Sequence, residues 1–397
     1  MTITGLNFDT IPVNNDVEFN DLSQAAVTSS TLTQISTTVP TNASSGHLNV
    51  RNFYGAATSS ADFFVLPAGY TAAQVGSTAR IVVDGSSLAV NTGTAGKVAM
   101  VLFDGVKGQS LGLGMPTLTT TPTTGLVTLT IYKPDNTVLT TCYMYGNARD
   151  CNLPLLPASG TYRIFADPGS STASFDLLLS SDLTGTLTVN GAAQAFITDR
   201  VGQNARYVFN GTAGQGFGLG IPAVFTTPAG GVATVSIYKP DNTKLTTCYM
   251  FGVAGSTCNL ALLPVSGSYT VFVDPGSYTA SFGLFMSSDI TGTLTPGGDA
   301  QMFSTDRVGQ NARYAFNGTA GQNLSLLFSG DTFSGSTSVY IYKPDGSLLS
   351  STSVYYSGSG PASTGTWNLT NLPATGTYTV FVTSSGAATG AISLQIP

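Results

Sequence analysis

Hydrophobic and polar residues alternate along most of this chain in short runs, which is the pattern of half-buried β-strands. No window shows the 3.6-residue period of an amphipathic helix. The alternation is clearest in the middle of the chain, where it predicts these strands: 183–189, 205–209, 216–221, 233–238, 268–273 and 281–286. With the return strand of a hairpin at 245–248, this makes about seven or eight short strands, which is typical of an antiparallel two-sheet sandwich.

Turn residues separate the predicted strands. Asn190-Gly191 follows the first strand and predicts a hairpin turn. Lys239-Pro-Asp-Asn242 predicts a tight turn, because proline presets φ and Asn242 tolerates the left-handed conformation. The same Lys-Pro-Asp turn begins at Lys133 and at Lys343.

One stretch of sequence occurs three times. Residues 198–215 return almost unchanged as 305–322, and a diverged copy lies upstream. Gly96 and Gly202 are 106 residues apart, and Gly202 and Gly309 are 107 apart. A tandem array extends length and surface more readily than it builds one active site. We therefore predict an all-β array of Ig-like or jelly-roll-like antiparallel β-sandwiches, with repeat 1 at 76–181, repeat 2 at 182–288 and repeat 3 at 289–397.

Residues 1–75 contain no copy of the repeat. Strands at 48–54 and 62–66 are expected to pack on or complete repeat 1, so that 46–75 forms one segment. Residues 1–45 are expected to be an extended arm, since the Thr- and Ser-rich stretch 25–45 has too few apolar side chains to order alone. The arm carries spaced apolar residues that suit a strand added to the sheet edge of another subunit, with docking in the same chain as the alternative: Leu6, Phe8, Ile11, Val17 and Phe19.

Composition narrows the choice of partners. Charged residues make up only 9% of the chain and the net charge is −6, so no basic stripe exists to neutralise nucleic-acid phosphates. A surface so poor in charge has weak protection against self-association, which suits a subunit that assembles. No apolar run is long enough for a membrane-spanning helix. The first residues also lack the features of a Sec signal, which leaves the export route open.

The four cysteines indicate an oxidising compartment. Cys142 and Cys151 occupy the same place in repeat 1 as Cys248 and Cys258 in repeat 2, which predicts one local disulfide in each repeat. Zinc is disfavoured because CxxC spacing and supporting histidines are absent. Repeat 3 has Thr352 and Trp367 at these positions, and the tryptophan is expected to cover the core there. We expect an extracellular or cell-surface protein.

No catalytic residue, cofactor site or metal site is predicted. His47 is the only histidine and opens a predicted strand, without the nucleophile elbow that a serine hydrolase would show. Turn chemistry explains Asp135, Asp241 and Asp345 after Lys-Pro, and Asp167 and Asp274 before Pro-Gly; calcium remains the alternative if those loops converge.

Two further sets of residues recur in the repeats. Asp199-Arg200 and Asp306-Arg307 are interpreted as local ion pairs, with a repeated contact to a ligand or between modules as the alternative; Arg206 and Arg313 recur in the same way. The aromatic residues Tyr143, Tyr145, Tyr249 and Phe251 surround the two predicted disulfides. They are candidate anchors for a sugar or a neighbouring subunit, unless they fold back on their own hairpin.

Five ordered phrases carry a family resemblance over residues 76–397, namely 182–188, 202–206, 238–241, 263–270 and 273–276. Together they resemble the tandem β-sandwich modules of large bacterial secreted and Rhs-type surface proteins, similar in layout to the bacterial pre-peptidase C-terminal domain. The resemblance implies a bacterial extracellular module used as a spacer or for binding, and it implies no catalytic residues. Repeat 3 departs from it, with Thr383-Ser-Ser-Gly386 in place of Asp-Pro-Gly.

The sequence therefore predicts a non-enzymatic structural subunit of an extracellular filament or surface assembly. Head-to-tail polymerisation with copies of itself, through strand donation by the N-terminal arm, is the expected mechanism. An adhesin or stalk fragment that binds carbohydrate or protein is the first alternative. An accessory region of a secreted hydrolase is the second.

Overall fold

The computed structural model describes the whole chain except residues 21–22, 124, 147–148 and 357–362. The fold is all-β, as predicted, and the helices among the described residues are two single turns, η1 (Pro12–Asn14) and η2 (Ala72–Gln74). The chain forms two compact units. Unit 1 contains Met1–Asp182 together with Arg200–Gln203, and unit 2 contains Leu183–Asp199 together with Asn204–Pro397.

The N-terminal part of unit 1 folds on itself into two small antiparallel sheets. Their facing apolar side chains enclose a core of their own that includes Phe19, Ile35 and Val50. The strands within residues 46–63 belong to the second of these sheets. The first sheet has the order β1 (Thr2–Thr4), β5 (Gln34–Thr37), β4 (Val27–Ser30), and the second β3 (Ser23–Ala25), β2 (Asp16–Phe19), β6 (Gly46–Asn52), β7 (Gly55–Phe63).

Repeat 1 has a five-stranded and a four-stranded sheet around one buried cluster. Alternate residues of the central strands enter this cluster, among them Leu129, Ile131 and Ile164. The five-stranded sheet has the order β13 (Val138–Met144), β12 (Val127–Tyr132), β15 (Gly160–Asp167), β10 (Val98–Gly105), β8 (Val75–Arg80). The other has the order β14 (Asp150–Asn152), β11 (Leu111–Thr121), β16 (Thr172–Ser181), β9 (Leu88–Asn91).

Repeat 2 has the same plan, with Tyr207, Val235 and Leu219 in its core. Its first sheet has the order β17 (Leu183–Thr186), β19 (Ala205–Gly211), β25 (Gly267–Asp274), β22 (Val232–Tyr238), β23 (Lys244–Phe251). Its second has the order β18 (Gln194–Ile197), β26 (Thr279–Ser288), β20 (Phe217–Ile221), β24 (Ser256–Asn259), with β21 (Phe225–Thr227) beside β26.

Two details of repeat 2 differ from the prediction. The turn at Asn190-Gly191 forms, but the strands on either side of it lie in different sheets, so the predicted hairpin is wrong. Strand β17 instead pairs in parallel with β19, from Leu183 beside Ala205 to Thr186 beside Val208. The sheets are therefore mixed rather than purely antiparallel.

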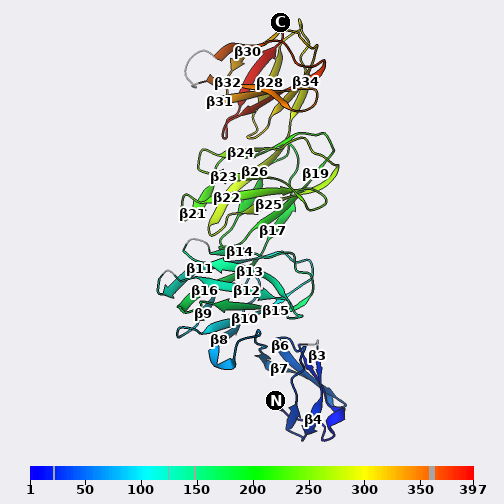
Figure 1. The fold of residues 1–397 in the computed structure, drawn as a ribbon, viewed down its shortest axis with the longest axis vertical. Coiled ribbons are helices and arrows are strands. Elements are labelled where there is room, and N and C mark those ends of the chain that lie inside the picture. The colour runs from blue at the N-terminus through cyan, green and yellow to red at the C-terminus, as the bar shows by residue number, and fades with distance from the viewer. Residues whose placement is uncertain (21–22, 124, 147–148, 357–362) are drawn as a thin grey trace. The chain divides into compact units, whose positions relative to one another are not determined.

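Repeat 3 ends the chain with a third pair of sheets (Figure 1). The first has the order β27 (Ile290–Thr293), β29 (Ala312–Gly318), β34 (Gly376–Ser384), β31 (Gly335–Tyr342), β32 (Leu348–Tyr356). The second has the order β28 (Gln301–Thr305), β35 (Gly390–Gln395), β30 (Leu324–Asp331), β33 (Ser363–Leu369). Trp367 of β33 packs against the core of this repeat, as expected for the residue that stands where the other repeats have a cysteine.

Both predicted disulfides are present. Cys142 is bonded to Cys151 and Cys248 to Cys258, with Cα atoms 5.9 Å and 5.8 Å apart. Each bond joins the edge strand of the five-stranded sheet to an edge strand of the other sheet. The bond therefore closes the side of the module at which the two sheets would otherwise separate.

Candidate functional site

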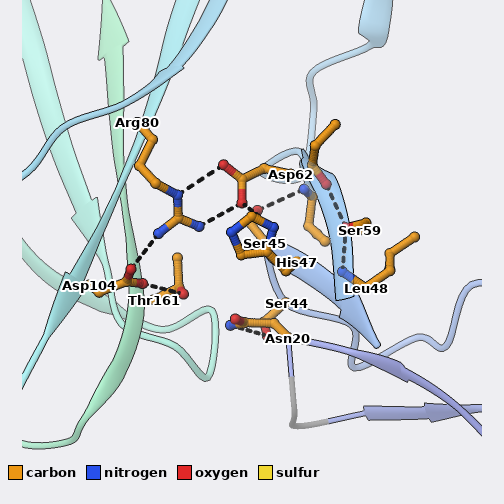
Figure 2. A network of polar contacts seen from close by, with 12 residues as sticks. Asn20, Ser44, Ser45, His47, Leu48, Ser59, Asp62, Arg80, Asp104 and Thr161 are labelled. Carbon is orange, nitrogen blue, oxygen red and sulfur yellow. Dashed lines mark hydrogen bonds and ion pairs between the residues drawn. The ribbon is translucent and has the colours of Figure 1, made fainter. Parts of the chain in front are cut away.

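The candidate functional residues of this chain lie where one module docks on the next. Arg80 fastens the N-terminal hairpin β6–β7 to the sheet of repeat 1 (Figure 2). Its guanidinium donates to Asp62 of β7, from Nε to Oδ2 at 3.0 Å and from Nη2 to Oδ1 at 2.5 Å. A third bond, from Nη1, reaches Asp104 of β10 at 2.6 Å. This forked ion pair raises the pKa of Arg80, so the arginine is a permanent cation between two carboxylates.

Arg163 anchors the segment between the N-terminal sheet and repeat 1. Its Nη1 donates to the Val65 carbonyl at 2.5 Å and to Ser45 Oγ at 3.3 Å, and its guanidinium carbon lies 4.4 Å from the centre of the Tyr132 ring. Burial lowers the pKa of Arg163 to about 10. Beside it, the hydroxyl of Tyr70 donates to Asp167, and this bond raises the pKa of Tyr70 to about 12.

The outer face of repeat 1 is apolar where this segment covers it. Val98, Met100 and Phe165 are buried, and Phe64, Leu66 and Tyr70 pack against them. The predicted strands and turns did not indicate that a segment covers this face of repeat 1, although the sequence carries a signal for it. Residues 98–103 are apolar without a break, which is typical of a strand buried on both faces, whereas the equivalent strand of repeat 2 alternates.

The recurrent Asp-Arg motif is a docking element. In unit 1, Arg200 donates from Nε to Ser180 Oγ at 2.7 Å, from Nη1 to the Gly85 carbonyl at 2.8 Å and from Nη2 to the Leu179 carbonyl at 3.2 Å. Gln203 adds a bond to the Ser181 carbonyl at 3.3 Å. All four acceptors belong to the sequence of repeat 1, and the loop 200–203 is accordingly part of unit 1.

Unit 2 contains the same arrangement between repeats 2 and 3. Arg307 donates from Nε to Ser287 Oγ at 3.0 Å and from Nη2 to the Met286 carbonyl at 3.4 Å, and it stacks 5.3 Å from the Phe285 ring centre. Gln310 donates to the Ser288 carbonyl at 3.2 Å. The interpretation of Asp306-Arg307 as a local ion pair is therefore wrong. The guanidinium is used for contact between modules, which was the alternative.

Arg313 forms the buried centre of the same junction. Its Nε donates to Asp289 Oδ2 at 2.5 Å and its Nη2 to the Leu260 carbonyl of repeat 2 at 3.3 Å, while its guanidinium carbon lies 4.1 Å from the Phe381 ring centre. The Asp289 side chain is only 1% exposed. Burial raises the pKa of this carboxyl, and the Arg313 cation opposes the rise. Asn311 donates to its second oxygen at 3.4 Å.

Glycines allow the docking loop to approach the preceding strand closely. A Cβ on Gly220 would lie 1.9 Å from the Val308 carbonyl oxygen, and one on Gly218 would lie 1.9 Å from the Gly309 carbonyl oxygen. Gly309 itself has a φ of +79°, a conformation that favours glycine. In unit 1, a Cβ on Gly114 would lie 1.8 Å from the Val201 carbonyl oxygen. The repeated Gly-Leu-Gly of repeats 1 and 2 is thus the surface that receives the loop.

The structure separates the predicted subunit contacts of residues 1–45 into two groups. Phe8, Val17 and Phe19 are buried in the N-terminal core of their own chain. Leu6 and Ile11 are exposed. The three buried side chains therefore offer no surface to another subunit, because β2 already pairs with β3 and β6.

The aromatic residues around the disulfides point to solvent. Tyr143, Tyr145, Tyr249 and Phe251 are all exposed, so they do not fold back on their hairpins. Tyr143 lies opposite Thr128 in the register of the sheet, and Tyr249 lies opposite Thr234. Each repeat with a disulfide thus presents two exposed aromatic rings at its edge strand, although Tyr145 lies just past β13 and Phe251 lies opposite Val232.

The remaining candidates have structural roles. Asp135, Asp241 and Asp345 each accept bonds from the residue two positions later, as in the predicted tight turns. Asp167 and Asp274 accept from Gly169 and Gly276 in the same way. His47 lies beside Asp62, with its Nδ1 3.7 Å from Oδ1 (Figure 2). Among the described residues, no group of three or more His, Cys, Asp or Glu side chains is close enough to hold a metal ion.

Comparison with known proteins identifies no family. No family model matches the chain. No curated protein matches it either. Two of the solved structures that match the chain do so at low similarity. The periplasmic g-type lysozyme inhibitor PliG of Aeromonas hydrophila is 16% identical, with a TM-score of 0.19, over 28% of this chain and 99% of that one. Tripeptidyl peptidase 2 is 7% identical, with a TM-score of 0.19, over 75% of this chain and 33% of that one.

Two observations bear on location. The two disulfides are compatible with a secreted or periplasmic protein. In the part of the chain that the structure describes, no helix has the length and apolarity needed to cross a membrane.

Proposed function

We propose that this chain is an exported structural protein, a subunit of an extracellular filament or surface assembly built from modules in series. One observation carries the proposal, namely the junction between repeats 2 and 3. Three charged side chains lie at this junction. Arg313 and Arg307 donate to Leu260 and Ser287 of repeat 2, and Arg313 is also paired with Asp289. Burying ionisable groups between modules is costly unless they are paired, so this chemistry serves to hold neighbouring modules in one orientation.

We propose further that each repeat is a β-sandwich of Ig-like or jelly-roll-like character. Each has a five-stranded sheet and a second sheet with four strands on its main path, and one buried cluster draws side chains from both. Such a module, repeated with almost no linker, is the building plan of the bacterial secreted and Rhs-type surface proteins that residues 76–397 resemble.

Strand donation by the N-terminal arm is not part of this proposal. The expected donor strand contains Val17 and Phe19, which are already buried within their own chain. Assembly must therefore use surfaces that remain exposed in the folded subunit.

Negative-stain electron microscopy of the purified full-length chain over a range of concentrations tests this function. A structural subunit is expected to form fibres or ordered sheets at high concentration. These assemblies should dissociate into single subunits on dilution. Particles that stay monomeric at the highest soluble concentration would contradict the filament and leave a stalk or spacer.

An adhesin or stalk is the second candidate, and the exposed aromatic pairs favour it. Tyr249 and Phe251 are two residues apart in β23, so their rings lie on the same face of the strand. There they could stack on the apolar face of a sugar ring. Screening the chain against immobilised glycans, with Tyr249→Ser and Phe251→Ser as the variant, tests this candidate. Binding that survives the double substitution would exclude these rings as the site.

A further inference from the structure

Two loops of the N-terminal module, residues 5–15 and 52–55, carry large apolar side chains at its surface. Phe53 and Tyr54, at the turn between β6 and β7, are 92% and 72% exposed. Leu6, Ile11 and Val13, in the connection 5–15 between β1 and β2, are also exposed. We call these five residues the apolar tip. Clusters of exposed apolar side chains are typical of surfaces that bind another molecule.

Hydrogen bonds hold the two loops of the apolar tip together. Asn52 Nδ2 donates to the Asn7 carbonyl at 3.0 Å and to Asn15 Oδ1 at 3.4 Å. The buried Asn15 donates to the Asp9 carbonyl at 2.8 Å and accepts from the Asp9 amide at 2.9 Å. Asp9 in turn accepts from the Ile11 amide at 2.8 Å. The apolar side chains are therefore presented by an ordered frame, which lowers the entropic cost of docking.

A complementary surface lies on repeat 2. A hollow of about 400 Å³ is lined without any charged residue, by Ala193, Ala195, Ile197, Pro222, Ala223 and Phe225 with part of β26. Ile197 and Phe225 are 65% and 59% exposed. We call this surface the repeat 2 hollow.

Repeat 1 is polar at the equivalent positions, so the hollow distinguishes repeat 2 from repeat 1. Ile197 and Phe225 both lie opposite Ser281, and in repeat 1 Asn91 and Thr119 both lie opposite Ser174. Gly283 of repeat 2 likewise takes the place of Asp176. Because repeat 1 folds with polar residues at these positions, folding of the module does not explain why Ile197 and Phe225 are apolar in repeat 2.

We propose that the apolar tip of one copy inserts into the repeat 2 hollow of a second copy. The two surfaces are matched in chemistry, since one projects large apolar side chains and the other is an apolar depression. The contact joins different surfaces on the two copies, so it does not close on itself and can propagate as a fibre. This inference rests on the proposed function and names the surfaces through which it acts.

Other occupants fit less well. Asp9 is the only charged residue in 5–15 and 52–55, and hydrogen bonds from Ile11 and Asn14 lower the pKa of its carboxyl. A permanent anion within the tip disfavours a membrane surface with anionic headgroups. The hollow offers few polar groups beyond Ser281, which disfavours a sugar.

Sedimentation velocity of the full-length chain and of two variants tests the contact. The tip variant is Phe53→Ser with Tyr54→Ser. The hollow variant is Ile197→Asn with Phe225→Thr, which places the residues of repeat 1 in repeat 2. Each is expected to raise the concentration at which half of the chains associate by ~tenfold or more, because anchors at the centre of an interface dominate its energy. Val106→Ser and Met302→Ser, at exposed positions elsewhere, should leave it unchanged.

Mixing the two variants gives the sharper result. Each retains one intact surface, so an equimolar mixture should form one-to-one dimers and nothing longer. If both variants assemble like the wild type, this contact is excluded while the proposed function stands. If the wild type does not associate at any concentration, or sediments only with lipid vesicles, the contact is overturned together with the filament.

Discussion

At the scale of single residues, the junction in unit 2 depends on close backbone approach. Gly220 and Gly309 place two chain segments so near that no side chain fits between them. The Leu219 carbonyl oxygen lies 2.5 Å from where a Cβ on Gly309 would stand. A side chain at either position would therefore collide with the backbone of the facing segment.

Gly220→Ala is expected to destabilise unit 2 by about 2 kcal/mol, because its Cβ must displace the Val308 carbonyl. Gly365→Ala is the matched control, since its Cβ would make an ordinary contact with Phe328 at 3.8 Å. Chemical denaturation of the full chain measures both. Equal midpoints for the two variants would show that the docking loop moves away without cost.

Asp331 is a buried carboxyl of repeat 3 that binds the Phe333 amide at 3.1 Å and the Thr337 hydroxyl at 3.2 Å through one oxygen. Its residue is 0% exposed, and burial raises the pKa of the carboxyl. A carboxyl with a raised pKa binds its proton more tightly in the folded chain. Its contribution to stability is therefore complete below the unfolded pKa of about 4 and is lost as pH rises through the folded pKa.

Asp331→Asn should consequently stabilise the chain by about 1 kcal/mol at neutral pH, with a gain that disappears toward pH ~4. Asp345→Asn in the same repeat should show the opposite trend. Hydrogen bonds from Ser347 lower the pKa of Asp345, so the stability they give is present at neutral pH and lost in acid. Thermal melting at a series of pH values compares the two, and parallel curves would contradict the assignment.

At the scale of elements, local sequence patterns predicted strands better than strand pairing. The alternation in 205–209 and 233–238 appears as β19 and β22, and the Lys-Pro-Asp turns form as expected. Pairing failed at Asn190-Gly191, since a turn signal reports the local backbone and not the sheet that the next strand joins. The pairing of β17 with β19 depends on contacts between residues far apart in sequence, which no local pattern contains.

The docking residues were harder to predict than the strands. Arg313 and Arg307 were visible as repeated residues, but their partners Asp289 and Ser287 lie 24 and 20 residues upstream, before β27 begins. Arg163 has no equivalent in the other repeats, so no repetition marked it. Only the unbroken apolar run 98–103 indicated that the strand was covered on both faces.

The β6–β7 hairpin and β8 should depend on their ion pair. Removing either partner, by Arg80→Gln or Asp62→Asn, is expected to cost about 1–2 kcal/mol, and the double variant should cost less than the sum. Limited proteolysis in the segment 64–75 and the thermal midpoint together measure this coupling. Strict additivity of the two substitutions would show that the pair contributes no stability.

At the scale of the whole chain, the docking residues are distributed according to the place of each repeat. Repeats 2 and 3 carry Arg-Val-Gly-Gln at 200–203 and 307–310, whereas repeat 1 has Thr-Ala-Gly-Lys at 94–97 and is covered by the N-terminal segment instead. Repeats 1 and 2 carry the receiving Gly-Leu-Gly, whereas repeat 3 has Ser-Leu-Leu at 325–327. These differences between the copies therefore coincide with the contacts that each module makes with its neighbours.

Arg313→Leu is the substitution that should uncouple repeats 2 and 3. It leaves Asp289 buried without its cation, which is expected to cost about 3–5 kcal/mol. The additional change Asp289→Asn should recover much of that loss by removing the uncompensated charge. Because burial then raises the pKa of Asp289 without opposition from a cation, the single variant should be least stable at neutral pH and should recover as pH falls.

Hydrogen exchange followed by mass spectrometry shows where the loss of stability occurs. Protection should fall on both sides of the junction, at residues 216–220 and 287–288 of repeat 2 and at 289 and 307–313 of repeat 3. Arg51→Leu, an exposed arginine of the N-terminal sheet, controls for loss of charge alone. Faster exchange confined to repeat 3, with the same amplitude at pH 5 and pH 8, would mean that Arg313 stabilises its own module and does not transmit stability to its neighbour.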